Sequence, residues 1–176
     1  MKNIVIIGLL AFIGISANLP NETKIGYVYM ELVMNSMPET KEMMAIVDKF
    51  TAEKQAEIEK RNVFINKKVE RFKKKSQSGE LSEAGKISTQ NEIVSLRKEL
   101  DKLISANEQE LYSKRSELLS PIAQKLEKAM DEVAAQKGYR YVFSSADGTG
   151  NSIIIVAPDA DDLTQEVMGY LGIGIK

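Results

Sequence analysis

The side chains with the clearest chemical potential form a basic stretch at residues 60–75. It holds eight Lys or Arg side chains against one acidic side chain, Glu70, for a local charge of +7. The basic residues are Lys60, Arg61, Lys67, Lys68, Arg71, Lys73, Lys74 and Lys75. Apolar side chains lie between them, among them Phe64 and Phe72. Such a mixture attracts an acidic or unfolded partner or an anionic lipid surface, but a solvated helix face has the same composition. Both interpretations stay open at this point.

The composition excludes most nucleophilic catalysis. The 176 residues include no Cys and no His, which removes thiol and imidazole catalysis, zinc fingers and Ser-His-Asp triads. The Lys, Ser and carboxylate side chains show no grouping of a nucleophile with a base. Gly148 and Gly150 are not followed by the Lys and Ser/Thr of a phosphate-binding loop. We therefore predict no enzyme activity, no catalytic residue and no cofactor.

Four acidic side chains gather near the C-terminus and raise the question of a cation site. They are Asp159, Asp161, Asp162 and Glu166. At the start of a helix, however, acidic side chains cap the backbone and complement the helix dipole. We expect Asp161 to cap a last helix from Asp162 to about Leu171, and we predict no metal site.

The overall charge argues against a nucleic-acid-binding protein. Lys and Arg number 24 and Asp and Glu 25, for a net charge of −1, whereas nucleic-acid binders are usually basic. With 43% apolar and 28% charged residues, the chain is too apolar to be disordered and too charged to be a membrane protein. A folded protein with no nucleic-acid partner is the expectation.

Residues 1–17 have the pattern of a secretory signal peptide. Lys2 precedes an apolar run from Ile4 to Ile15, and small and polar residues follow at 16–18. A cationic start, an apolar run of about 7–15 residues and a small-residue exit are typical of such a peptide. The run is short for a bilayer span of about 20 residues. We expect export to the periplasm, with an uncleaved membrane anchor as the alternative.

Two long helical segments must position the basic stretch. Residues 38–75 contain no Gly and no second Pro, and Ser36 and Glu39 have the spacing of a capping box;. Turn residues at 76–79 and a capping Ser82 then start a second segment. Residues 51–80 hold only six strongly apolar side chains, too few for a globular core. We predict an antiparallel coiled-coil hairpin over 38–120 with its tip near 76–80.

Apolar periodicity identifies the expected seam between the two segments. It comprises Met44, Val47, Phe50, Ile58, Ile65, Val69 and Phe72 in the first segment and Ile87, Val94, Leu96, Leu100, Leu103, Leu111 and Leu118 in the second. Pro121 lacks a backbone donor and should kink or restart the second helix. The periodicity then ends at Lys137 and Gly138, which are typical of a helix C-terminus.

The rest of the chain predicts a small β-rich body. Residues 18–37 hold a strand near 24–30 and a short helix. Residues 121–176 hold a helix, two strands near 139–143 and 152–156, and the last helix;. Strands this few and short are marginal alone, so we expect this α+β protein to associate through them. The candidate oligomerisation residues are Ile25, Tyr27, Tyr29, Tyr141, Phe143, Ile153, Ile154 and Ile155.

Several short segments, taken in order, carry a resemblance to a known family. They are Lys24-Ile25-Gly26-Tyr27-Val28, Asn35-Ser36-Met37-Pro38-Glu39, Leu119-Ser120-Pro121-Ile122, Ala129-Met130-Asp131-Glu132-Val133-Ala134, Gly138-Tyr139-Arg140-Tyr141-Val142 and Asp161-Asp162-Leu163-Thr164-Gln165-Glu166-Val167. Their order and spacing resemble the Skp/OmpH family of periplasmic chaperones over essentially all of the chain after residue 17. The sequence departs from a simple match to this family in two places: the first segment of the hairpin is rich in Lys, and the C-terminal tail contains Gly.

The resemblance implies a homotrimer in which three helical tentacles surround a cavity. It also implies ATP-independent holding of unfolded outer-membrane proteins. The basic stretch with Phe64 and Phe72 is then the candidate client-binding surface, with an anionic lipid surface as a further partner. The periodicity leaves open which apolar side chains face the cavity and which face the seam. The alternative function is a structural coiled-coil subunit of a cell-envelope assembly, which would have a fixed partner.

Overall fold

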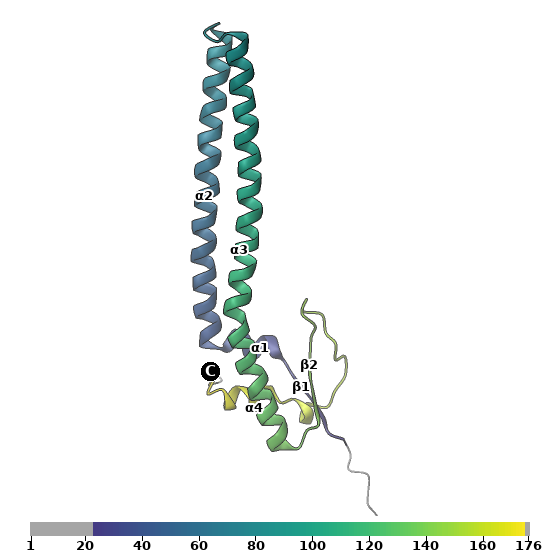
Figure 1. Ribbon diagram of the computed structural model, residues 1–176. Coiled ribbons are helices and arrows are strands. Elements are labelled where there is room, and N and C mark those ends of the chain that lie inside the picture. The colour runs from purple at the N-terminus through teal and green to yellow at the C-terminus, as the bar shows by residue number, and fades with distance from the viewer. Residues whose placement is uncertain (1–22, 175–176) are drawn as a thin grey trace, which may run out of the picture.

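A long helical hairpin rises from a small body in the computed structural model, which describes residues 23–174 (Figure 1). The hairpin consists of α2 (Pro38–Gln77) and the part of α3 (Glu83–Lys137) that runs antiparallel to it. The predicted signal peptide lies outside the described residues. Within residues 23–174 no helix combines the length and the apolar character that a membrane crossing requires.

The ends of the two long helices follow local sequence signals, with one exception. Gly79 adopts a positive φ of 74° at the tip, and the Ser82 hydroxyl accepts a hydrogen bond from the Gly85 N–H at 3.2 Å, as the sequence predicts. The predicted capping box at Ser36 is wrong. Ser36 ends α1 (Met30–Ser36), and its hydroxyl donates to the Leu32 carbonyl at 2.7 Å, so Met37 stands at the cap of α2 without a side-chain bond.

Helix α3 continues through Pro121 and enters the body. The helix is continuous from Glu83 to Lys137 and ends at Gly138, whose φ of 75° is left-handed. In Figure 1 its lower part leans away from α2, consistent with the bend that an internal Pro causes. The predicted restart of the helix at Pro121 is therefore not found, and a bend at this residue stays a prediction.

The seam between the helices differs in part from the apolar pattern. Val47 and Ile65 are buried, but Met44, Ile87 and Val94 are exposed, so their assignment to the seam is wrong. Ile93 is buried instead, together with the polar Asn107. Ion pairs also join the two helices: Lys54 with Glu110 at 2.5 Å, Lys68 with Glu92, and Glu39 with Lys125. The seam thus mixes a thin apolar contact with charged pairs.

The body contains a two-stranded parallel sheet. Strand β1 (Ile25–Val28) pairs with β2 (Tyr141–Ser144), with Ile25 opposite Tyr141 and Tyr27 opposite Phe143. Because the strands are parallel, the whole hairpin forms part of the crossover between them. The predicted strand near 152–156 is wrong for the single chain. Only Ser152 forms a bridge, with Ala146, and among residues 23–174 no further strand pairs with the segment.

The apolar core lies where the lower part of α3 meets β1, α1 and α4 (Thr164–Tyr170). Its buried members are Val28, Val33, Leu126, Ala129, Val133, Leu163, Val167 and Met168. A short 3₁₀ turn, η1 (Asp159–Asp161), precedes α4. Asp161 does not cap the last helix as expected, because its carboxylate accepts a hydrogen bond from the Tyr139 hydroxyl at 3.1 Å. Asp162 accepts from the Thr164 N–H instead, at 2.9 Å.

Candidate functional site

The basic stretch lies on the outer half of α2, away from the body (Figure 1). Two of its cations have acidic partners: Lys68 pairs with Glu92 across the hairpin, and Lys73 lies 3.7 Å from Glu70. The other six have no ion-pair partner among residues 23–174; they are Lys60, Arg61, Lys67, Arg71, Lys74 and Lys75. Lys68 therefore helps to hold the two helices together, whereas the six unpaired cations are available to a partner.

Charge is distributed unevenly along the hairpin. Residues 60–104, which form its outer half, carry 12 Lys or Arg and 6 Asp or Glu. Residues 38–59 and 105–120, which form its inner half, carry 5 basic and 9 acidic side chains. The outer half therefore attracts anions and the inner half repels them, within the screening length of about 10 Å at 0.1 M salt.

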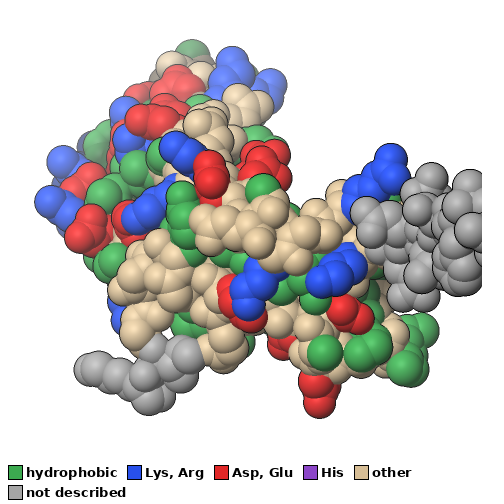
Figure 2. Space-filling view, turned by 90° about the horizontal axis from the view of Figure 1, so that it is seen from below, with side chains coloured by type: hydrophobic (Ala, Val, Ile, Leu, Met, Phe, Trp, Pro, Cys, Tyr) green, Lys and Arg blue, Asp and Glu red, His purple; other side chains and the backbone are tan. Residues whose placement is uncertain are grey.

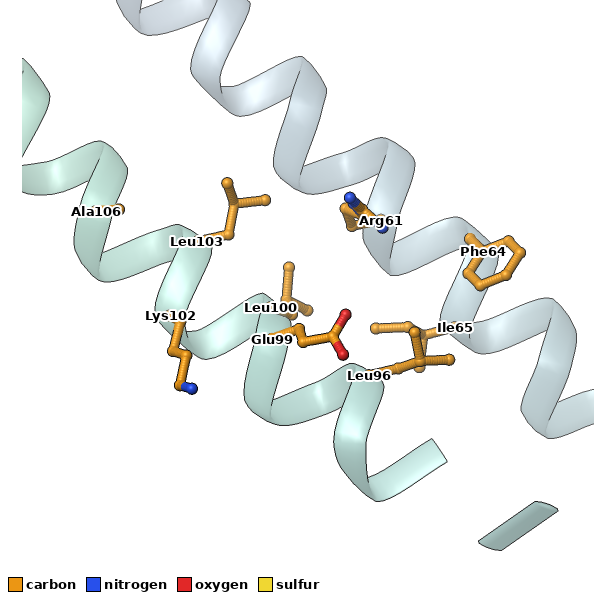
Figure 3. A pocket seen from close by; sticks show the side chains of 9 residues that line it. All are labelled: Arg61, Phe64, Ile65, Leu96, Glu99, Leu100, Lys102, Leu103 and Ala106. Carbon is orange, nitrogen blue, oxygen red and sulfur yellow. The ribbon is translucent and has the colours of Figure 1, made fainter. Parts of the chain in front are cut away.

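An apolar groove opens between the helices beside the start of the basic stretch. Figure 3 shows Arg61, Phe64 and Ile65 of α2 facing side chains of α3 across a hollow of about 330 Å³. The α3 lining is Leu96, Glu99, Leu100, Lys102, Leu103 and Ala106. Phe64 is 52% exposed although it is a large aromatic residue. A groove of this kind offers apolar contact with charged groups at its edge.

A second hollow continues the groove toward the body. It is lined by Phe50 and by residues of α3, and it shares Ala106 with the first. The Lys54 ammonium lies 5.2 Å from the Phe50 ring centroid. The Glu110 carboxylate raises the pKa of Lys54 through a hydrogen bond, so this cation remains charged at the groove edge. Together the two hollows extend from Phe50 to Phe64.

The predicted client-binding residues separate into two groups in this arrangement. Arg61 and Phe64 line the groove, whereas Phe72 is half-buried and lines neither hollow. The α3 side of the groove was missed by the sequence reasoning, which considered only one helix for binding. Its signal is present in the sequence, because folding the chain back at the predicted tip places residues near 100 opposite residues near 64.

The candidate oligomerisation residues lie on the body, and most are exposed. Ile25, Tyr29, Tyr141, Phe143 and Ile153 are each about half exposed, and Ile155 is 91% exposed. Tyr27 is the exception, since it is buried and packs edge-on against Tyr29 with ring centroids 5.7 Å apart, while Ile154 is half-buried. Seen from the body end, hydrophobic side chains reach the surface at several places (Figure 2). The single chain thus leaves apolar surface uncovered here.

The carboxylate of Asp147 accepts several hydrogen bonds within the loop between these exposed groups. Asp147 accepts hydrogen bonds from the Thr149 N–H at 2.8 Å, the Thr149 hydroxyl at 2.7 Å and the Asn151 N–H at 2.9 Å. These bonds, with that of the Thr149 hydroxyl the largest, lower the pKa of Asp147 to about 2. The expected turn at 147–151 is therefore present, although the strand predicted to follow it is absent.

Three of the four acidic side chains near the C-terminus, those of Asp161, Asp162 and Glu166, have structural partners. Glu166 pairs with Lys137 at 2.8 Å, which lowers the pKa of Glu166. The Asp161 and Asp162 carboxylates accept the bonds described above. Residues 23–174 contain no group of three or more acidic, His or Cys side chains arranged to hold a metal ion.

Comparison with known proteins gives an independent view of this architecture. The sequence matches the family described as outer membrane protein (OmpH-like) over residues 24–171. The fold is similar to that of a protein from Caulobacter crescentus CB15 described as a candidate outer membrane chaperone (OmpH-like). The TM-score is 0.68, the sequence identity is 12%, and the match covers 86% of this chain and 85% of that chain. No curated protein matches the sequence.

Proposed function

The chain belongs to the OmpH-like family, and from this premise we propose that it is a periplasmic holdase chaperone that works without ATP. It binds unfolded outer-membrane proteins between helical tentacles and prevents their aggregation. The observation that carries the proposal is the open apolar groove on the hairpin with unpaired cations beside it. The chaperone description of the Caulobacter crescentus relative supports the same role.

The dimensions of the groove suit a short extended segment. Residues 50 and 64 lie about 21 Å apart along α2 at about 1.5 Å per residue. An extended chain advances about 3.3 Å per residue, so about six client residues would occupy this length. Strands of outer-membrane barrels alternate apolar and polar side chains, and the apolar set of such a segment can contact Phe64 and the α3 leucines. Many weak contacts of this kind retain a client without folding it.

Exposed apolar groups of the body support a homotrimeric assembly. Within residues 23–174 the segment Ile153–Val156 forms no strand, and its backbone bonds to the rest of the chain are those of the Ile153 and Ile154 N–H groups to the Ser145 carbonyl. An uncovered apolar segment of this type readily pairs with another copy. Ile155→Asp is therefore a sharp test, since a side chain that is 91% exposed in the single chain tolerates a charge unless another copy covers it. Light scattering is expected to give three chains for the wild type and one for Ile155→Asp. Equal masses would contradict assembly through this segment.

An aggregation assay tests the chaperone role. An unfolded outer-membrane β-barrel protein is diluted from denaturant with the full chain and without nucleotide. Light scattering from aggregates is expected to fall with the wild type and to fall less with Phe64→Ser. A fixed structural subunit of an envelope assembly, the alternative function, would leave the aggregation unchanged.

Charge reversal distinguishes the contribution of the cations to client binding from the contribution of the groove. Lys67→Glu combined with Lys74→Glu reverses two unpaired charges of the basic stretch. We expect client association, followed by stopped-flow at low salt, to become about tenfold slower and the difference to shrink as salt rises. Lys41→Glu with Lys128→Glu makes the same change in net charge away from the basic stretch and is the matched control. Equal rates for the two double variants would assign the basic stretch to a solvated face.

Two further experiments address the partners and the location. Vesicles of anionic and of neutral lipid, mixed with the same two double variants, test whether the basic stretch also binds a membrane surface.

N-terminal sequencing of the protein from its native host is expected to begin near Asn18, whereas an intact Met1 in the membrane fraction would support the anchor alternative.

A further inference from the structure

The face of α2 that borders the groove carries four exposed charged side chains. They are Glu53, Glu57, Arg61 and Arg71, and none of them forms an ion pair among residues 23–174. At about 100° per residue, the four positions share an arc of about 80° with Phe64, which lines the groove next to Arg61 (Figure 3). A client segment in the groove therefore lies beside these charges.

The sign of these charges changes once along the helix. The two acidic side chains lie on the body side of Arg61, at about 6 Å and about 12 Å along the helix axis. Arg71 lies about 15 Å from Arg61 in the direction of the tip. The groove is therefore acidic toward the body and basic toward the tip. The net charges of the inner and outer halves of the hairpin have the same order.

The remaining charged residues that line the two hollows add no net charge. Each has a neighbour of opposite sign, and the pairs are Glu110 with Lys54, Lys114 with Glu117, and Glu99 with Lys102. The first two pairs are ion pairs, and the members of the third line the same hollow. The four side chains of α2 therefore determine how the net charge varies along the groove.

The acidic end of this series acts on a neighbouring side chain within the structure. The pKa of Lys54 is raised mainly by its hydrogen bond to Glu110, and the negative charges of Glu57 and Glu53 raise it further. The Lys54 ammonium lies at the groove edge, 5.2 Å from the Phe50 ring centroid. A basic side chain of a client at this end of the groove is attracted by the same two carboxylates.

We infer that this charge order fixes the orientation in which a client segment lies in the groove. The acidic end of the segment lies toward Arg61 and the tip, and its basic end lies toward Glu57 and the body. The inference rests on the proposed holdase function and names the class of segment that the groove prefers. That class is an extended segment of alternating apolar side chains with opposite charges at its two ends.

The spacing of the charges on α2 sets the length of such a segment. Glu53 and Arg61 lie about 12 Å apart along the axis, and Glu53 and Arg71 about 27 Å apart. An extended chain advances about 3.3 Å per residue. The two charges of a preferred segment are therefore about four to eight residues apart.

Disulfide capture of a synthetic peptide measures the orientation, because the chain has no Cys. Ser113→Cys places a thiol in the hollow beside Phe50. Ser95→Cys places one next to Leu96, which lines the hollow beside Phe64. The two positions are 18 residues apart, which is about five turns, so they lie on one face of α3. Each variant is prepared as the full chain.

Two peptides of equal composition serve as probes. Both have blocked termini and an alternating apolar and polar core of about six residues. In the first, all Asp residues stand at one end and all Lys residues at the other; in the second, Asp and Lys are mixed at both ends. The same end of each, which is the acidic end of the first, carries a Cys as a disulfide with thionitrobenzoate. The protein thiolate displaces this dye, and the release of the dye measures the rate.

The rates of the mixed peptide correct for the different reactivity of the two protein thiols. After this correction, the charge-separated peptide is expected to react about fivefold faster with Ser95→Cys than with Ser113→Cys. Equal corrected rates would overturn the inference and leave the proposed function standing. If neither peptide reacts with either variant faster than with free N-acetylcysteine, the groove does not bind such segments, which would contradict the proposed function as well.

Reversal of the charge order gives a second measurement. Glu53→Arg, Glu57→Arg, Arg61→Glu and Arg71→Glu, combined in each Cys variant, reverse the order without changing the net charge. The preference is expected to invert, with faster reaction at the thiol beside Phe50. Circular dichroism verifies that the helices are intact. An unchanged preference in the folded variant would overturn the inference.

A smaller change covers the case in which four substitutions disturb folding. Glu53→Gln with Glu57→Gln removes the acidic end alone and is expected to reduce the preference to about twofold. Asp48→Asn with Glu59→Gln also removes two exposed acidic side chains of α2, but these positions lie about 140–160° around the helix from Arg61. This control is expected to keep the full preference. Equal effects of the two double variants would contradict a role of the groove face.

Discussion

The body and the hairpin bury their apolar side chains in different ways. In the body, Val28, Val33 and Leu126 are fully buried within one compact cluster. In the hairpin, two helices share a narrow seam with isolated buried residues such as Ile65 and Ile93, one buried amide, and cross-helix ion pairs. The body thus depends on a conventional core. The hairpin buries fewer side chains, but it is long and exposes a large surface.

This difference predicts that the same kind of truncation has unequal effects in the two regions. Leu126→Ala is expected to lower the free energy of unfolding by about 2–5 kcal/mol, because the residue is fully buried in the body core;. Ile93→Ala, in the seam, is expected to cost about 1–3 kcal/mol. Urea unfolding followed by circular dichroism measures both. Equal losses would show that the seam is packed as tightly as the core.

Asn107 offers a way to convert the seam into a more conventional core. The residue is 95% buried, and its side-chain N–H₂ has no hydrogen-bond partner in the described part of the chain, residues 23–174. Asn107→Leu is expected to stabilise the hairpin by about 1–2 kcal/mol, since an unpaired buried polar group is destabilising. Asn66→Leu, on an exposed position of α2, is the control and should stay within about 0.5 kcal/mol. A loss of stability in Asn107→Leu would show that the amide is satisfied in solution.

A substitution at the tip tests whether the stability of the outer end of the hairpin depends on local hydrogen bonds. The Ser82 hydroxyl supplies the cap of α3, and Ser82→Ala is expected to cost about 1 kcal/mol of helix stability. Amide hydrogen exchange should quicken in the first turns of α3 and remain unchanged in the body. Faster exchange in the body as well would mean that the two regions unfold as one unit.

The smallest expected effect concerns the Asp147 turn of the body. Its pKa of about 2 in the folded chain lies below the ordinary value of 3.8. The turn is therefore stabilised fully above about pH 4, and this contribution is lost as the pH falls through 2. Carboxyl titration by NMR should locate the low pKa, and Thr149→Val should raise it by removing the strongest hydrogen bond. An Asp147 pKa near 3.8 in the wild type would contradict the hydrogen-bonded turn.

Much of the fold was predictable from local signals. The two long helices were predictable because capping and helix termination depend on nearby residues. The signals are the Gly-free run, the turn cluster, Ser82 and Gly138. The seam was only partly predictable. Choosing apolar residues alone selected Val94 in place of its neighbour Ile93, although one position turns the side chain by about 100°. The true seam also includes polar and charged positions that an apolar pattern does not identify.

Local signals in the sequence were enough to predict the helical hairpin, its tip, the basic stretch and the lack of Cys and His chemistry. Contacts between distant segments were needed to show that β1 pairs in parallel with β2, that residues 153–156 form no strand within the described chain, and that the groove combines Phe64 with leucines of α3. The physical reason is the range of the interactions. Helices form from contacts within a few residues, whereas strand pairing and grooves depend on contacts between segments far apart in the chain.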